Sequence, residues 1–241
     1  MKGVILAGGL GTRLDPLTRV TNKHLLPVFN KPMIFYPIKT LVTAGIKSIL
    51  IVTGGNNAGD FLKLLGNGEE FGIEDIRYTY QKGEGGIADA LKLAEHFVGK
   101  DKCVVVLGDN VLNKSIKPFV EEYKKQKSGA KVLIKKVPDP ERFGVAEFRG
   151  KKIVSILEKP KNPPSDYIVT GVYMYDGRAF EFVKKLKPSK RGELEITDVN
   201  NMYLKRGELT YNILEGDWTD CGTFESLYRA NRLVAKSHVK E

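Results

Sequence analysis

The chain has 241 residues, of which 41% are hydrophobic and 28% charged, a balance typical of a soluble globular protein with one sizeable core. Its longest apolar runs are only strand-length, and its first residues lack the apolar segment and cleavage site of a signal peptide, which excludes a membrane-spanning protein and predicts no secretion signal. The two cysteines, Cys103 and Cys221, indicate a reducing cytoplasm, where we expect the protein to be located, and not a disulfide scaffold.

The formal net charge of +10 raises nucleic-acid binding as a function class. The lysines are spread along the chain in clusters typical of solvated helix faces, such as residues 123–127. No basic stripe alternates with aromatic residues, as a groove for single strands would require. A small polyanionic substrate, or the lysine-rich surface of some thermophile proteins, accounts for the charge, and nucleic acid is not an expected partner.

Strand and helix patterns alternate through the first half of the chain. This alternation predicts a mainly parallel sheet with right-handed crossovers. The buried-strand patterns cover residues 4–7, 48–52, 76–80 and 103–107. The helical patterns cover residues 32–44, 60–65 and 87–97, with Pro32 suited to a helix start and Gly45 to a helix end.

The second half changes character, because its strands have shorter connections that favour mixed or antiparallel pairing. Strands are predicted at residues 131–137, 145–148, 153–158 and 168–175, and helices at 179–186, 196–206 and 224–236. The predicted fold class is therefore α/β, with a Rossmann-like, mainly parallel mixed sheet flanked by helices. We expect residues 1–241 to form one domain, whose N-terminal half binds a nucleotide and whose C-terminal half completes the pocket.

A glycine-rich loop directly follows the first strand, reading Gly8-Gly9-Leu10-Gly11-Thr12-Arg13, and Lys23 lies ten residues further on. Open α/β sheets bind ligands at the carboxyl ends of their strands, where glycines let backbone N–H groups approach phosphate oxygens. The spacing fits neither the dinucleotide fingerprint, which needs glycine where Leu14 stands, nor the P-loop. The loop therefore indicates a different kind of nucleotide site; a tight turn with two surface bases is the alternative interpretation.

Two aspartates stand at positions that suit a magnesium site. Asp109 follows the most apolar strand, and Asp220 lies in a compact turn, 218–223, before the last helix. Mg²⁺ prefers one or two carboxylates together with substrate phosphates. A helix-capping role is the alternative for Asp109. Cys221 belongs to no motif with a histidine, so we assign it to packing and not to nucleophilic catalysis.

A strand-end pair, Glu158-Lys159, and the segment 190–193 supply further charged groups. A glutamate and a lysine at a strand end suit a sugar hydroxyl and a phosphate, respectively. As an isolated pair they would more often form a surface ion pair of little energetic value.

These motifs together resemble those of the sugar-1-phosphate nucleotidylyltransferases, over nearly the whole chain. The general family motif is the glycine loop, and the segments at 139–145 and 186–198 are more specific to the branch that transfers thymidylyl groups. The matching segments are LAGGLGTRL (6–14), NKHLLP (22–27), KPMI (31–34), LGDN (107–110), DPERFGV (139–145), EKP (158–160), VTGVYMYD (169–176), LKPSKRGELEITD (186–198) and WTDCGT (218–223).

The resemblance implies transfer of a thymidylyl group from dTTP to α-D-glucose 1-phosphate, with release of pyrophosphate and Mg²⁺ as cofactor. It also implies a homo-oligomer. The residues that it places on the nucleotide are Leu6, Gly8, Gly9, Gly11, Thr12, Arg13, Lys23, Gln81, Gly86 and Asp109. Those that it places on the sugar phosphate are Asn110, Gly144, Glu158, Lys159, Val169, Gly171 and Arg191. Arg13, Lys23, Asp109 and Asp220 are the expected catalytic residues, and the two aspartates the expected metal ligands.

The residue inventory predicts direct in-line displacement, because an acceptor phosphate is already a nucleophile and no general base is needed. The sequence departs from the family pattern at His24, where glutamine is common, and at Gly83-Glu84-Gly85, which replaces a proline-containing turn. A UTP-using or less selective enzyme is therefore the alternative. A binding module without catalysis is disfavoured because both aspartates, Lys23 and Arg13 are present. The chain ends near the expected end of the catalytic domain, so the resemblance does not extend to the feedback control of longer relatives.

Overall fold

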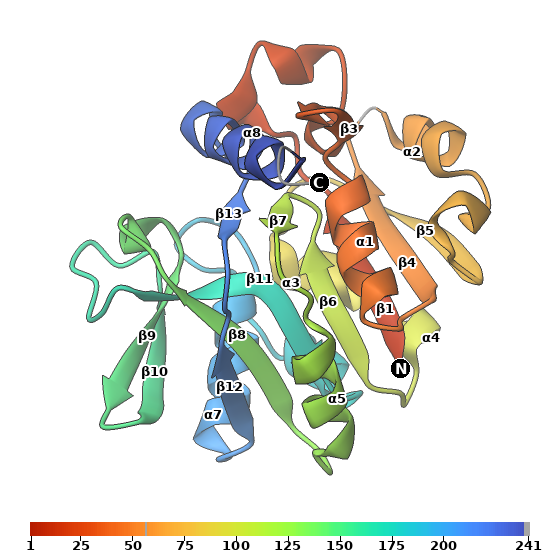
Figure 1. Ribbon diagram of the computed structural model, residues 1–241. Coiled ribbons are helices and arrows are strands. Elements are labelled where there is room, and N and C mark those ends of the chain that lie inside the picture. The colour runs from red at the N-terminus through yellow and green to blue at the C-terminus, as the bar shows by residue number, and fades with distance from the viewer. Residues whose placement is uncertain (56, 239–241) are drawn as a thin grey trace.

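The computed structural model describes residues 1–55 and 57–238 of the chain. A nine-stranded mixed sheet runs through the molecule, with helices on both faces (Figure 1). Its strands are Lys2–Ala7 (β1), Ser48–Gly54 (β4), Asp75–Gln81 (β5), Cys103–Leu107 (β6), Ala130–Lys136 (β8), Gly144–Arg149 (β9), Lys152–Glu158 (β10), Tyr167–Tyr175 (β11) and Leu209–Ile213 (β12). Two small sheets pair Pro27–Val28 (β2) with Lys31–Pro32 (β3), and Asn110–Leu112 (β7) with Trp218–Asp220 (β13).

Short and long helices connect these strands. The α-helices are Phe35–Thr43 (α1), Ala58–Leu65 (α2), Ile87–Lys92 (α3), Glu95–Val98 (α4), Lys117–Lys125 (α5), Arg178–Val183 (α6), Ile196–Lys205 (α7) and Phe224–His238 (α8). The 3₁₀ turns are Thr12–Leu14 (η1), Leu17–Arg19 (η2), Lys23–Leu25 (η3), Glu69–Phe71 (η4) and Pro140–Arg142 (η5). No described helix is both long enough and apolar enough to cross a lipid bilayer.

The predicted mainly parallel sheet is confirmed in the first half of the chain. β1 pairs in parallel with β4 on one side and β6 on the other, and β5 extends the sheet beyond β4. Both faces of these strands are covered: Val4 and Leu6 pack with α3 and α6, while Ile5 and Ala7 pack with α1 and α5. Burial on both faces explains why β1 and β6 are continuously apolar and do not alternate.

The strands of the second half pair mostly antiparallel, as their short connections predict. The sheet also forks there, because two strands pair with different parts of one edge of β11. On one edge of β11, Ile168 pairs with β9, whereas Val172–Tyr175 pair with β6. The other edge of β11 pairs with β8, and β12 joins β8 in parallel. Between Ile168 and Val172 the edge of β11 has no registered partner in β6 or β9. An opening therefore forms between these two strands, next to the carboxyl end of β6.

Several elements differ from the sequence-based expectation. Helix α5 and strands β2, β3, β7 and β12 were not predicted, and the helix predicted over 179–186 ends at Val183. The helix predicted from Pro32 begins at Phe35, because Pro32 belongs to β3 and pairs with Pro27. The helix predicted over 87–97 is divided into α3 and α4, since the backbone N–H groups of Leu93 and Ala94 bond three residues back and not four. The compact turn predicted over 218–223 begins with strand β13.

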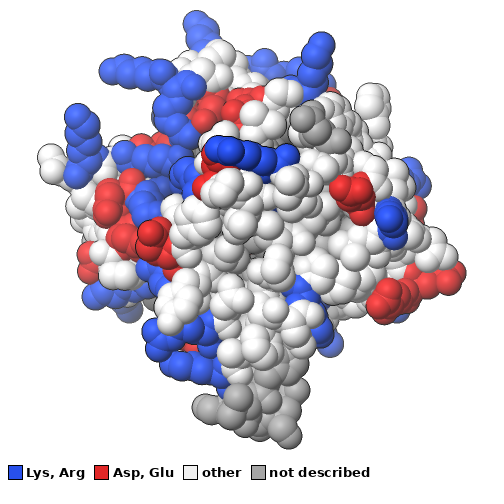
Figure 2. All heavy atoms as spheres, turned by 90° about the horizontal axis from the view of Figure 1, so that it is seen from above, with Lys and Arg blue, Asp and Glu red and all other residues white. Residues whose placement is uncertain are grey.

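Charged side chains are unevenly distributed over the face seen from above (Figure 2). Lys and Arg side chains project mainly along one side of this face, Asp and Glu lie among them, and uncharged residues fill its centre. Acidic side chains thus interrupt the basic ones here. This face shows no uninterrupted basic stripe of the kind that tracks a nucleic-acid backbone.

Candidate active site

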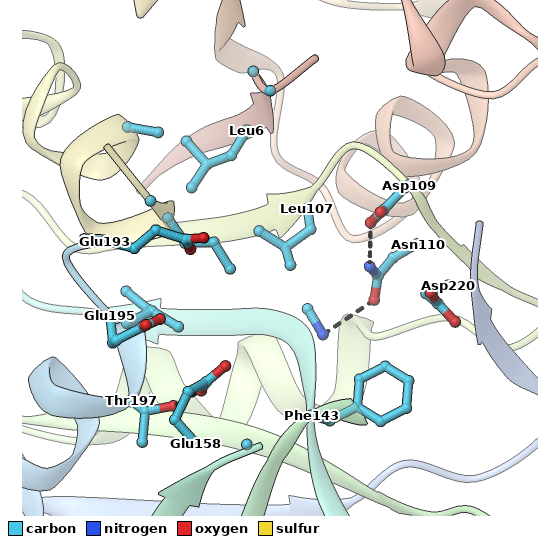
Figure 3. Close-up of a pocket in the computed structure, with 18 of the residues that line it drawn as sticks. Leu6, Leu107, Asp109, Asn110, Phe143, Glu158, Glu193, Glu195, Thr197 and Asp220 are labelled. Atoms are coloured by element: carbon cyan, nitrogen blue, oxygen red, sulfur yellow. Dashed lines mark hydrogen bonds between the residues drawn. The ribbon is translucent and has the colours of Figure 1, made fainter. Parts of the chain in front are cut away.

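A cavity of about 560 Å³ opens where β1, β5 and β6 end and where the sheet forks at β11. Every residue that the sequence predicts for the site lines this cavity, including Leu6, Gly86, Asn110, Gly144 and Val169. Figure 3 shows Leu6 and Leu107 in its middle, Asp109 and Asp220 to one side, and Glu158, Glu193, Glu195 and Thr197 to the other. The cavity therefore has an apolar centre between two charged ends.

The glycine loop forms one wall of the cavity. A Cβ on Gly8 would lie 2.5 Å from Gln81 Oε1, so the loop can pass over the end of β5 only without a side chain there. Gly9 and Gly11 have φ of +89° and +68°, in the left-handed region that favours glycine. These two backbone conformations turn the chain from β1 into η1 and place Thr12 and Arg13 on the cavity.

Lys23 and Asp109 form an ion pair inside the cavity. Lys23 Nζ lies 2.7 Å from Asp109 Oδ2, and the side chains are only 13% and 15% exposed. Burial opposes ionisation of Asp109, but the charge of Lys23 and the hydrogen bonds from Lys23 and Asn110 outweigh it, so the pKa of Asp109 lies below its usual range. Asp109 is therefore ionised near neutral pH.

His24 is buried close to this pair. A Cβ on Gly108 would lie 2.6 Å from its Cδ2 atom, and its Nδ1 lies 2.8 Å from Asn22 Oδ1. Burial, together with the charge of Lys23, lowers the pKa of His24 to about 3. The ring is therefore neutral at physiological pH and adds no charge to the phosphate-binding end.

Asp220 is anchored by a chain of alternating charges that the sequence analysis did not predict. Arg142 Nη2 donates to Asp220 Oδ2 over 2.8 Å, and Arg142 Nη1 lies 2.8 Å from Asp139, which also pairs with Arg229 of α8. The Gly222 N–H donates to the same Asp220 oxygen. Burial and the Asp109 charge nevertheless raise the pKa of Asp220 above its usual value. The conspicuous segment 139–145 was the only sequence signal for Arg142.

The two aspartates fit a magnesium ion that also binds substrate phosphates. Asp220 Oδ2 accepts from Arg142, Gly222 and Ser226, while Oδ1 has no recorded hydrogen bond to a described residue. No group of three or more His, Cys, Asp or Glu side chains in the described ranges has the geometry to hold a metal by itself. Two carboxylates without a third are compatible with Mg²⁺, which takes one or two carboxylates together with substrate phosphates.

At the other end of the glycine loop, Gln81 has a fixed amide orientation. Its Nε2 donates to Gly86 O over 3.2 Å and to Asp89 Oδ2 over 2.8 Å, which uses both of its hydrogens. The side chain is 4% exposed, and its Oε1 faces Gly8. Gln81 therefore presents an acceptor to the cavity.

The side chain of Asn110 is bonded to the backbone of β11 at the point where the sheet forks. Asn110 Oδ1 accepts from the Gly171 N–H over 3.0 Å and from Trp218 Nε1 over 2.7 Å, while its Nδ2 donates to Asp109. Figure 3 shows two dashed lines that meet at the Asn110 amide group: its bond to Asp109 and its bond from the Gly171 N–H. A Cβ on Gly171 would lie 2.6 Å from the Asn110 amide nitrogen, so only glycine allows this approach.

The remaining end of the cavity combines three carboxylates with two cations. Arg191 lies 2.6 Å from Glu193, 3.4 Å from Glu195 and 3.8 Å from Glu158. Thr197 donates to Glu158, but burial raises the pKa of Glu158 and the Glu195 charge adds to this. Lys159 follows in the left-handed region, with φ of 44°, which is strained for a residue with a Cβ. Burial and the Arg191 charge lower the pKa of Lys159.

Several cavity residues were missed by the sequence analysis because their motifs suggested no individual role. They include Glu84, Arg142, Phe143, Tyr173, Glu193, Glu195, Thr197 and Trp218. Phe143 and Trp218 meet edge to face, with ring centroids 5.6 Å apart. The quoted segments 139–145, 186–198 and 218–223 already contain most of these residues, so a full reading of those segments could have found them.

Comparison with known proteins agrees with this geometry. A family model described as nucleotidyl transferase matches residues 2–237. The glucose-1-phosphate thymidylyltransferase of Neisseria meningitidis is 50% identical over 97% of this chain and 82% of its own length, and that of Xanthomonas campestris pv. campestris is 43% identical over 100% and 82%.

Solved structures give the same result. A Bacillus anthracis protein assigned as a glucose-1-phosphate thymidylyltransferase, in complex with sucrose, has a TM-score of 0.93 and 57% identity, covering 97% of this chain and 94% of its own. A UDP-glucose pyrophosphorylase complexed with UDP-glucose has a TM-score of 0.84 and 26% identity, covering 98% of each chain. Because the cavity lies in a fold shared along almost the full chain, and the family model spans residues 2–237, this protein belongs to the nucleotidyl transferase family.

Proposed function

We propose that this enzyme transfers a thymidylyl group from dTTP to α-D-glucose 1-phosphate, giving dTDP-glucose and pyrophosphate. The observation that carries the proposal is one cavity that has the glycine loop and the Gln81 acceptor in one part and the charged groups of Glu158, Lys159 and Arg191 in another. The curated relatives named for this reaction support it, since they align over nearly all of this chain. We expect the reaction to occur in the cytoplasm and in a homo-oligomer.

The nucleotide is assigned to the wall formed by residues 8–13, with its base at Gln81 and Gly86. A thymine ring carries a donor at N3, and Gln81 Oε1 is the acceptor left available when both amide hydrogens are engaged. Cytosine has an acceptor at N3, so two acceptors would face each other. A mismatched pair of this kind costs roughly 1–3 kcal/mol in a buried site.

A second candidate function differs only in the base. Uracil has the same N3–H as thymine, so the Gln81 contact does not reject UTP, and the related pyrophosphorylase structure was solved with UDP-glucose. The turn 83–85 beside Gln81 carries no side chain except that of Glu84 and adds no apolar group for the thymine methyl. A UTP-using or less selective enzyme is therefore the alternative.

The sugar phosphate is assigned to the opposite end of the cavity. Glu158 supplies an acceptor for sugar hydroxyls, and Gly144, Val169 and Gly171 line the same part of the cavity. Lys159 and Arg191 supply positive charge for the phosphate. The phosphate would compete with Glu193 and Glu195 for Arg191, so binding requires that residue to exchange partners.

Catalysis in this arrangement is by positioning and charge. The acceptor phosphate needs no general base, and the neutral, buried His24 is not placed to be one. Arg13 and Lys23 would neutralise the nucleotide phosphates, each cation contributing on the order of 3 kcal/mol in the transition state. Mg²⁺, held by Asp109 and Asp220, would supply further charge stabilisation at the transferring phosphate.

The test is pyrophosphate release measured over a matrix of dTTP, UTP, CTP, ATP and GTP against glucose 1-phosphate, galactose 1-phosphate and mannose 1-phosphate. We expect the highest kcat/KM for dTTP with glucose 1-phosphate, UTP second and CTP far lower, and dTDP-glucose as the product. The variant Asp220→Asn serves as the inactive control. A maximum at a purine nucleotide or at another sugar phosphate would overturn the assignment.

A further inference from the structure

The turn after β5 reaches across to the glycine loop through one side chain. Glu84 Oε1 accepts a hydrogen bond of 3.0 Å from the backbone N–H of Leu10, 74 residues earlier in the chain. Glu84 is exposed and lines the cavity, and Leu10 lies at the tip of the glycine loop. The contact therefore ties Glu84, which lines the cavity, to the glycine loop, whose Gly9 and Gly11 line the cavity on either side of Leu10.

The Glu84 carboxylate is an anion, and it accepts its hydrogen bond from a loop whose backbone N–H groups suit anions. Leu10 lies between Gly9 and Gly11, both left-handed, and consecutive backbone N–H groups in such a loop form a concavity for phosphates or carboxylates. Glu84 thus occupies an N–H group in the very loop that is assigned to the nucleotide phosphates. An incoming triphosphate would compete with the carboxylate for this wall and would be repelled by its charge.

The side chain of Glu84 is not part of the contacts that fix the base-reading side chain. Gly83, next to Glu84, has φ of +75°, and a Cβ there would meet nothing within 4 Å. Gln81 is held by Asp89 of α3 and by the backbone carbonyl of Gly86, and neither bond uses the Glu84 side chain. A change at Glu84 is therefore expected to leave the base acceptor in place.

Resting on the nucleotide site proposed above, we propose that Glu84 is an internal competitor for the triphosphate: its carboxylate holds the glycine loop closed to anions, and the nucleotide must displace it. Glu84 sets triphosphate affinity without touching the reacting atoms. Removing its charge therefore strengthens triphosphate binding, the opposite of what loss of a binding residue would do.

The experiment is equilibrium binding by isothermal titration calorimetry, without Mg²⁺ or sugar phosphate, to the full chain and to Glu84→Gln, Glu84→Ala and Glu70→Gln. Glu70, exposed on η4, is the control for an equal change of net charge. The probes are dTTP, inorganic tripolyphosphate and thymidine. In both Glu84 variants we expect Kd for dTTP and tripolyphosphate to fall about fivefold, which corresponds to about 1 kcal/mol, the interaction of two unit charges about 4 Å apart in water.

Thymidine affinity should stay at the wild-type value in both Glu84 variants, and Glu70→Gln should match wild type for every probe. Unchanged or weaker binding of dTTP and tripolyphosphate in both Glu84 variants would overturn the proposal. An equal gain for thymidine would also overturn it, because the effect would then not concern phosphates. If wild type binds dTTP no more tightly than tripolyphosphate and does not bind thymidine, the proposed nucleotide site fails, while the role of Glu84 is still decided by tripolyphosphate.

Discussion

Lys23 and Asp109 lie 86 residues apart in the chain, yet Lys23 Nζ is 2.7 Å from Asp109 Oδ2. The pairing follows from topology, because both residues come after neighbouring parallel strands, β1 and β6, whose carboxyl ends meet at one edge of the sheet. In the proposed reaction both partners are needed elsewhere: Lys23 on the nucleotide phosphates and Asp109 on Mg²⁺. The ion pair therefore keeps both charges in position until the substrate arrives.

Asp109→Asn and Asp220→Asn should each fold but lose activity by on the order of 100-fold or more, because Mg²⁺ loses an anionic ligand at the triphosphate. Excess Mg²⁺ should restore part of the loss. The measurement is turnover over a range of Mg²⁺ concentrations, with circular dichroism to confirm folding. Near-normal turnover of both variants at limiting Mg²⁺ would rule out the metal assignment.

Lys159→Ala and Arg191→Ala should weaken binding of glucose 1-phosphate by about tenfold and leave dTTP binding nearly unchanged, since a hydrogen bond to a charged group contributes about 1.5–3 kcal/mol. Arg13→Ala should do the reverse. The exposed neighbour Lys190 provides a matched control, Lys190→Ala, which should resemble wild type. The measurement is the equilibrium Kd of each substrate alone. Equal losses of affinity for both substrates in all three site variants would contradict the assignment of the two substrates to different parts of the cavity.

Gln81→Ala should narrow the preference for dTTP over CTP and the purine nucleotides by roughly 1–3 kcal/mol, because the buried acceptor matched to N3–H is removed. The ratio of dTTP to UTP should not change, since both bases carry that donor. Relative kcat/KM values for the competing nucleotides test this. If the variant ranks all nucleotides as wild type does, the base is read elsewhere.

Glu158→Gln should raise the free energy of unfolding at pH 8 while weakening glucose 1-phosphate binding. Burial, with the Glu195 charge, raises the folded-state pKa of Glu158, so its ionised form is held at a cost in stability. That cost is present above the folded-state pKa and disappears as the pH falls below the unfolded-state value. The gain should therefore vanish in acid, as measured by chemical denaturation at pH 8 and pH 4.

The exposed variant Glu147→Gln, on β9, is the control and should leave stability unchanged at both pH values. Lower stability of Glu158→Gln than of wild type at pH 8 would show that the Thr197 and Arg191 contacts outweigh the cost of burial.

The first half of the fold was predictable because its strands are buried on both faces and read as apolar runs; the prediction for β6, residues 103–107, coincides with the observed strand. The helix start at Pro32 was wrong because proline suits both a first helical turn and a short strand, and only the pairing with Pro27 distinguishes them. Strand β12 was not predicted, since its pairing with β8 depends on a partner some 80 residues away.

The site residues could be named because strand ends and glycine loops concentrate chemistry in α/β sheets. Contacts between side chains that are distant in the sequence could not be predicted. Arg142 reaches Asp220 across 78 residues, and Glu84 reaches Leu10 across 74, and neither pairing has a local sequence signal. Sequence motifs thus predicted residues that line one cavity, whereas the ion pairs between distant side chains became apparent only in the three-dimensional structure.

The central claim is that both substrates occupy one cavity and react directly, with no covalent nucleotidyl-enzyme. No activated nucleophile stands at the site, because Cys221 is fully buried and burial raises its pKa well above the usual value, and Lys23 is engaged with Asp109. The most direct measurement is exchange of labelled pyrophosphate into dTTP without any sugar phosphate. The account predicts no exchange until glucose 1-phosphate or dTDP-glucose is present; robust exchange in their absence, abolished by Cys221→Ser or Lys23→Ala, would contradict it.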